Sequence, residues 1–68
     1  MKKQDKIVNY ISGTPTDSET LMMNFVNHGW TRHQVAGAVG SAIKVGRVSV
    51  CGQIWCARRK KIINVFVN

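Results

Sequence analysis

The chain has 68 residues, of which 44% are hydrophobic and 19% are charged, and its ten Lys and Arg outnumber its three Asp and Glu to give a net charge of +7. A chain of this length forms a single small domain with a thin core, and its composition excludes a disordered chain and a membrane-spanning helix. All three acids precede Thr20, so the rest of the chain has seven basic residues and no carboxylate and should attract a polyanion. We expect that polyanion to be nucleic acid, although the same charge would also serve solubility.

The first predicted element is a helix over about residues 2–12. Ile7 and Ile11 recur at helical spacing, and Gly13 followed by Pro15 ends the pattern. No strand signal separates this helix from the next one.

A second helix is predicted over about residues 17–28 and a third over about 31–45. The second begins where Thr16 and Glu19 have the spacing of a capping box, and Gly29 ends it. A turn of about three residues therefore joins the two helices, as in a helix-turn-helix. Their expected buried faces consist of Leu21, Met22, Phe25 and Val26 in the second helix and of Val35, Val39, Ala42 and Ile43 in the third.

After Gly46 the apolar residues alternate with a period of two, which predicts short antiparallel strands. The expected strands span about 47–51, 54–58 and 62–67. The hairpin turn could fall at Gly52, at the four consecutive basic residues 58–61, or at both. The last strand would leave a free edge that could pair with a second copy of the chain.

The segment Trp30-Thr31-Arg32-His33-Gln34-Val35-Ala36 opens the third helix, and Ala42-Ile43-Lys44-Val45-Gly46-Arg47-Val48 closes it and leads into the first strand. With three helices followed by a hairpin, this pattern resembles the winged helix-turn-helix superfamily of DNA-binding domains. The resemblance implies an α+β fold, with one winged domain over residues 1–68 and a C-terminal hairpin of two or three antiparallel strands as its wing. The short strand that many such domains place between their first two helices has no counterpart around 13–16.

The third helix has a face opposite its buried stripe that is nearly bare of bulk, centred on His33, Gly37, Gly40 and Lys44. A recognition helix turns its N-terminal residues toward base edges in the major groove, where Arg pairs with guanine and Gln with adenine. The two glycines would let the helix backbone approach the groove wall, or they mark internal packing or a dimer contact. The residues of this helix expected to contact DNA are Thr31, Arg32, His33, Gln34, Ser41 and Lys44.

The wing is expected to contact DNA phosphates through its four basic residues Arg58, Arg59, Lys60 and Lys61. Because no acid lies near them in the sequence, we favour phosphate contact over a solvated turn that only discourages strand pairing. Trp30 and Trp55 should pack in the core or on the wing rather than stack on unpaired bases.

No Ser-His-Asp, Cys-His or phosphate-loop pattern is present, so we expect neither enzymatic activity nor a cofactor. Cys51 and Cys56 cannot supply four zinc ligands, and His28 and His33 lack finger spacing, so no metal site is predicted. The N-terminus has no signal-peptide pattern. This predicts a cytoplasmic protein with reduced cysteines, associated with the nucleoid in a bacterium or a phage.

The sequence therefore predicts a small protein that binds double-stranded DNA as a transcriptional regulator or a DNA-architectural accessory factor. One such module buries a small interface, so a homodimer or a protein partner is expected to add specificity. Two alternatives use the same features: an adaptor or inhibitor that docks on an acidic protein surface, and an RNA-binding module that uses Trp55 and the basic residues.

Overall fold

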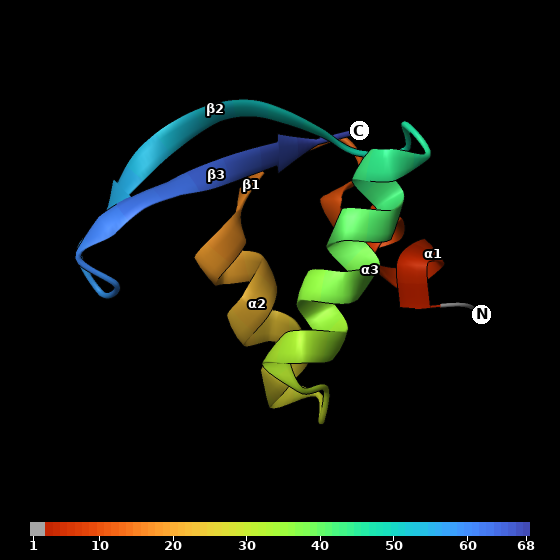
Figure 1. The fold of residues 1–68 in the computed structure, drawn as a ribbon, viewed down its shortest axis with the longest axis horizontal. Helices are drawn as coiled ribbons and strands as arrows, with labels where there is room; N and C mark the ends of the chain where they lie inside the picture. Colours follow the sequence, from red (N-terminus) through yellow and green to blue (C-terminus); the bar gives the residue numbers. More distant parts are fainter. Residues whose placement is uncertain (1–2) are drawn as a thin grey trace.

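The computed structural model describes residues 3–68 and shows an α+β fold in the winged-helix layout, with three helices and a three-stranded antiparallel sheet (Figure 1). In chain order the elements are α1 (Lys3–Ile11), β1 (Thr16–Asp17), α2 (Ser18–Asn27), α3 (Arg32–Lys44), β2 (Ser49–Cys56) and β3 (Lys61–Val67). The expected start of the first helix, at about residue 2, lies outside the described residues.

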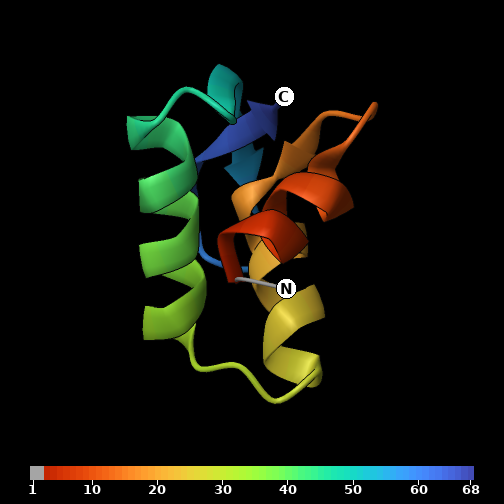
Figure 2. The same ribbon diagram turned by 90° about the vertical axis from the view of Figure 1, so that its right-hand side faces the viewer.

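The core lies between the three helices and the inner end of the sheet. Ile7 and Ile11 of α1 and Ala42 of α3 are completely buried, and Phe66 of β3 joins them. Figure 2 shows α3 standing on one side of the molecule, with α1 and α2 on the other. The core therefore covers the inner face of α3 and leaves the outer face open.

The buried stripe of α3 consists of Val35, Ala38, Val39 and Ala42, which follow the i, i+3, i+4, i+7 spacing of one helix face. Ile43 lies one position beyond this face and is 39% exposed, so its predicted burial is wrong. The helix thus turns one apolar side chain toward solvent near its C-terminal end.

Two helices end where the sequence predicts. Gly29 after α2 has a φ of 94° and Gly46 after α3 has a φ of 81°, a left-handed conformation that glycine adopts without strain. The start of α2 differs from the prediction, because Asp17 is its N-cap and Thr16 belongs to β1. The expected capping box between Thr16 and Glu19 is therefore wrong.

β1 is a strand that the sequence did not predict. It pairs with the end of β3, with Thr16 opposite Phe66 and Asp17 opposite Val65. The strand order is β1-β3-β2, so the last strand lies in the middle of the sheet and its predicted free edge is wrong. Two residues are too few to show a period of two, so β1 forms because β3 lies beside it rather than from its own sequence.

The β2–β3 hairpin, which we call the wing, turns at residues 57–60, which include three of the four basic residues 58–61, and not at Gly52. What the sequence predicted as two strands before this turn is the single strand β2, with a bulge between Val50 and Gly52. The wing projects beyond the helices (Figure 1). Trp55 lies on the wing opposite Ile62, and the two are 64% and 61% exposed, so of the two predicted places for Trp55 the core is wrong.

Candidate nucleic-acid interface

The N-terminus of α3 is fixed by a reciprocal cap. The backbone N–H of Gln34 donates to the Thr31 hydroxyl oxygen at 3.1 Å, and the backbone N–H of Thr31 donates to Oε1 of Gln34 at 3.0 Å. Both N–H groups would otherwise lack a partner at a helix start. Thr31 and Gln34, which were expected to contact DNA, thus cap the helix. Gln34 can offer an adenine its whole amide only if this cap opens.

The outer face of α3 is exposed along its length, as predicted, through His33, Gly37, Gly40, Ser41 and Lys44. A Cβ atom built on Gly37 or Gly40 would meet no atom within 4 Å. Neither glycine therefore serves packing inside the molecule, which removes one of the three expected reasons for them. Each glycine still lowers the stability of an exposed helix by about 0.8–1 kcal/mol relative to Ala. Contact with another molecule, rather than packing in the free protein, would explain why this face is bare.

Two hollows flank α3. One, of about 400 Å³, lies between α1 and α3, and its lining includes Lys3, His33 and Ser41. The other, of about 270 Å³, lies between α3, α2 and β3, and its lining is mainly apolar and includes Ile43 and Phe66. The exposed face of α3 is therefore a ridge, which is the shape required of a helix that enters a groove.

The first turn of α2 is held by Asp17. Its carboxylate accepts hydrogen bonds from the backbone N–H of Thr20 at 2.9 Å and from the Thr20 hydroxyl at 2.7 Å. Burial acts to raise the pKa of Asp17, but the hydrogen bonds from Thr20 and from the backbone of Asp17 and Glu19 together outweigh it and hold the pKa below its ordinary value of 3.8. A firmly capped α2 in turn fixes the backbone position of Glu19.

The carboxylate of Glu19 lies near arginines from two distant parts of the chain. Its carboxylate lies 3.9 Å from Arg32 at the start of α3, 4.0 Å from Arg58 and 3.7 Å from Arg59, both in the wing turn. The Glu19 side chain is 10% exposed, whereas those of Arg32, Arg58 and Arg59 are 51%, 68% and 39% exposed. We call these four residues the Glu19 cluster: a covered carboxylate beneath three solvent-facing guanidinium groups.

The contacts within the Glu19 cluster are long. They exceed hydrogen-bond distance, and Oε2 of Glu19 is buried without a hydrogen-bond partner among the described residues. One negative charge faces three positive ones, and Lys60 in the turn and Lys61 just after it add two more. The cluster therefore keeps a net positive charge, and its arginines can accept another anion without first breaking a hydrogen bond to Glu19.

No acid lies near the basic wing in the sequence, but the fold brings Glu19 beside it. Glu19 is 39 residues before Arg58 in the sequence and is brought beside it by the fold. No sequence pattern predicts this contact, because a helix start already accounts for an acid at position 19. The cluster also places Arg32 and the wing turn on one side of the molecule.

The C-terminal end of α3 carries a different arrangement of charge. Arg47, just after the helix, donates to Asp5 and Gln4 of α1 and is therefore largely neutralised. Lys44, in the last turn of α3, is exposed. Of these two basic residues, Lys44 is the one that can meet a polyanion at this end of the helix.

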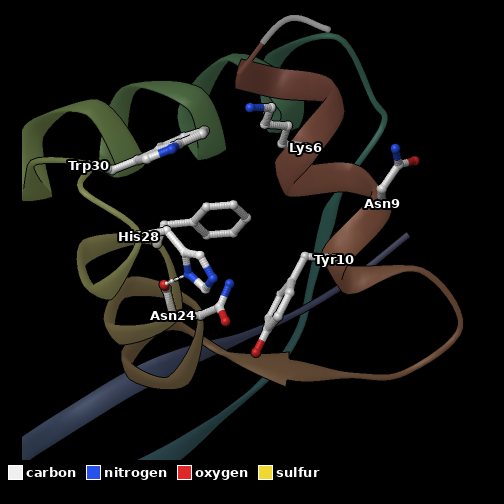
Figure 3. A pocket seen from close by; sticks show the side chains of 7 residues that line it. Lys6, Asn9, Tyr10, Asn24, His28 and Trp30 are labelled. Atoms are coloured by element: carbon white, nitrogen blue, oxygen red, sulfur yellow. Dashed lines mark hydrogen bonds between the residues drawn. The ribbon is translucent and has the colours of Figure 1, made fainter.

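A separate hollow of about 570 Å³ lies between α1, α2 and the turn that follows α2 (Figure 3). The rings of Trp30 and Phe25 lie 4.6 Å apart between centroids, and Tyr10 meets Phe25 edge-on at 5.5 Å. Nδ1 of His28 lies 2.6 Å from the carbonyl oxygen of Asn24. Trp30 is thus a packed residue, as predicted, and the hollow contains none of the residues expected to contact DNA.

Cys51 is exposed and Cys56 is half-buried, and both are free thiols. Within residues 3–68, no three His, Cys, Asp or Glu side chains are grouped so that they could hold a metal ion.

None of the helices in this part of the chain combines the length and the apolar character needed to cross a bilayer.

Comparison with known proteins finds no match for this chain among family models, curated proteins or solved structures. Function is therefore inferred from α3, the wing turn and the Glu19 cluster that joins them.

Proposed function

We propose that the protein binds double-stranded DNA, with α3 in the major groove and the wing turn on the phosphate backbone, as a transcriptional regulator or an architectural accessory factor. The observation that carries the proposal is the Glu19 cluster, in which one carboxylate lies within 4.0 Å of guanidinium groups from the start of α3 and from the wing turn. Binding to a duplex requires a helix in the groove together with cations on the flanking phosphate backbone.

Phosphate is an anion that suits the cluster. Arginine pairs with phosphate through short, charge-assisted hydrogen bonds, whereas Glu19 offers the three guanidinium groups contacts of 3.7–4.0 Å. Arg32, Arg58 and Arg59 are each at least 39% exposed and can turn outward to such a ligand. Glu19 thus keeps the arginines together in the free protein while leaving them available.

The bare face of α3 supports the major groove as the place of the helix. Open space surrounds Gly37 and Gly40, and hollows lie on both flanks of the ridge. A helix without bulk on its outer face can bring its backbone close to base edges and sugars. On the same exposed face, we expect His33 and Ser41 to contact base edges and Lys44 to contact a phosphate.

Binding to duplex DNA, single-stranded RNA and a polyglutamate chain, each measured over a range of salt, tests the proposal. Six exposed cations (Arg32, Lys44, Arg58, Arg59, Lys60 and Lys61) would give the duplex a log–log salt slope of up to about −5 at about −0.9 per phosphate. We expect the duplex to bind tightest of the three. A duplex Kd weaker than about 10⁻⁴ M at physiological salt refutes the proposal, and so does tighter binding of RNA or polyglutamate.

A matched pair of variants locates the interface. Lys60→Ala removes an exposed charge from the wing turn, whereas Lys6→Ala removes one from α1, beside the aromatic hollow. The Lys60 variant should weaken binding to every duplex sequence and reduce the salt slope by about 0.9, and the Lys6 variant should leave the slope unchanged. Equal effects of the two substitutions would show that net charge alone drives binding.

A further inference from the structure

The outer edge of β2 is the longest unpaired backbone edge in the part of the chain that the structure describes. β2 pairs with β3 along one side only, because β3 is the central strand. Seven of its eight residues are exposed. An exposed edge of this kind presents unpaired N–H and C=O groups to any strand that approaches it.

Edge strands in monomeric proteins are protected by charged side chains, proline or bulges. β2 has the sequence Ser-Val-Cys-Gly-Gln-Ile-Trp-Cys, with no charge and no proline, in a chain whose residues are 19% charged. Its bulge, between Val50 and Gly52, protects the start of the strand and leaves residues 52–56 regular. Ile54 and Trp55 in this regular part are 47% and 64% exposed.

We infer that residues 52–56 of β2 pair with the same segment of a second copy of this chain, in antiparallel orientation, to give a continuous six-stranded sheet. The partner is a second copy because the edge is uncharged although the protein carries +7, so an acidic partner would find no cation along this strand. A strand with the same uncharged, apolar character is the complement that the edge requires, and β2 itself is one.

The charges of the wing turn select the antiparallel orientation. Parallel pairing would bring two sets of Arg58, Arg59 and Lys60 within about 5 Å of each other, the spacing of neighbouring strands. Antiparallel pairing centred on Ile54 separates the two turns by roughly 30 Å, at about 3.3 Å per residue. That distance exceeds the Debye length of about 10 Å at moderate salt, so the repulsion is screened.

The paired edge makes a weak dimer. A stable interface takes about 800 Å² from each partner, which is nearly a fifth of the 4377 Å² surface of this protein. β2 contributes eight of 68 residues and cannot supply that area. We expect a Kd on the order of 10⁻⁴ M, with self-association that strengthens as salt screens the net charge.

The dimer has a geometric consequence that rests on the proposed function. A two-fold axis between antiparallel edge strands runs perpendicular to the sheet, so both copies keep their helices on the same face of it. Two α3 helices would then face one duplex together. The self-association itself does not depend on DNA and is tested without it.

Sedimentation of nuclease-treated protein with a reductant, from about 10 µM to about 1 mM, tests the inference directly. We expect a monomer–dimer equilibrium that shifts toward dimer as salt rises from about 0.05 M to 0.5 M, and concentration-dependent NMR shifts confined to the amides of β2. Ile54→Lys should weaken the dimer at least tenfold. Ile62→Lys, the same change at an exposed position of the central strand β3 opposite Trp55, should leave it intact.

Several results would overturn the inference. The first is a protein that stays monomeric at about 1 mM in high salt. The second is a dimer that both lysine substitutions weaken equally. The third is a dimer that disappears under reducing conditions and therefore depends on disulfides. Shifts confined to the helices would do the same. Because this experiment contains no nucleic acid, a failure of the dimer inference leaves the DNA-binding proposal standing. A protein that stays monomeric and still binds duplex would refute the first and support the second.

Discussion

The two glycines on the exposed face of α3 give the sharpest test of how this helix is used. Gly37→Ala and Gly40→Ala each place a methyl group where no atom lies within 4 Å, so neither change can strain the free protein. Each substitution should stabilise the helix by about 0.8–1 kcal/mol, because alanine is the better helix former and restricts the unfolded chain. The two together should raise the melting temperature by about 6–16 °C for a domain of this size.

Binding should move in the opposite direction. If α3 lies against the walls of the major groove, each added methyl group overpacks a tight contact at a cost of about 1–3 kcal/mol. That cost corresponds to a loss of affinity of roughly 5- to 150-fold per substitution. Stability can be followed by thermal unfolding and affinity by fluorescence anisotropy with a labelled duplex.

Gly52→Ala provides the control. Its added methyl group also meets open space, but the residue lies in β2 and not on α3. Measured at protein concentrations far below the dimer Kd of about 10⁻⁴ M, where the protein is monomeric, it should leave DNA affinity unchanged. If the alanine variants of α3 are stabilised and bind duplex as tightly as the parent protein, α3 does not approach DNA closely, and the reasoning that places it in the groove is refuted.

Two further predictions concern carboxylates. Glu19→Gln removes the negative charge beneath Arg32, Arg58 and Arg59. Affinity for duplex should therefore rise, and the salt slope should steepen by about 0.9, as for one additional phosphate contact. Weaker binding at low salt would show that Glu19 mainly positions the arginines. The lowered pKa of Asp17 contributes stability that is present above about pH 3.9 and is lost as the pH falls through the folded-state value. Asp17→Asn keeps the cap without titrating and should flatten the pH dependence of urea unfolding between about pH 5 and 2; an unchanged profile would assign that dependence to other groups.

The sequence by itself determined the elements that depend on neighbouring residues. Gly29 and Gly46 end their helices because a left-handed residue is a local requirement, and Thr31 caps α3 through contacts within one turn of helix. The sequence left the hairpin turn open between Gly52 and the basic residues 58–61, and the structure places it at residues 57–60. The exposed face of α3 also followed from the period of its apolar residues.

Only the tertiary structure decided which distant segments meet. β1 exists because Phe66 and Val65 lie beside it, and Glu19 meets Arg32, Arg58 and Arg59 because α2, α3 and the wing converge. Apolar character left the core and the wing both open to Trp55, and the fold places it on the wing opposite Ile62, where it is 64% exposed. Burial and charge pairing are properties of the assembled fold, because they depend on distances in space that the order of residues along a chain does not contain.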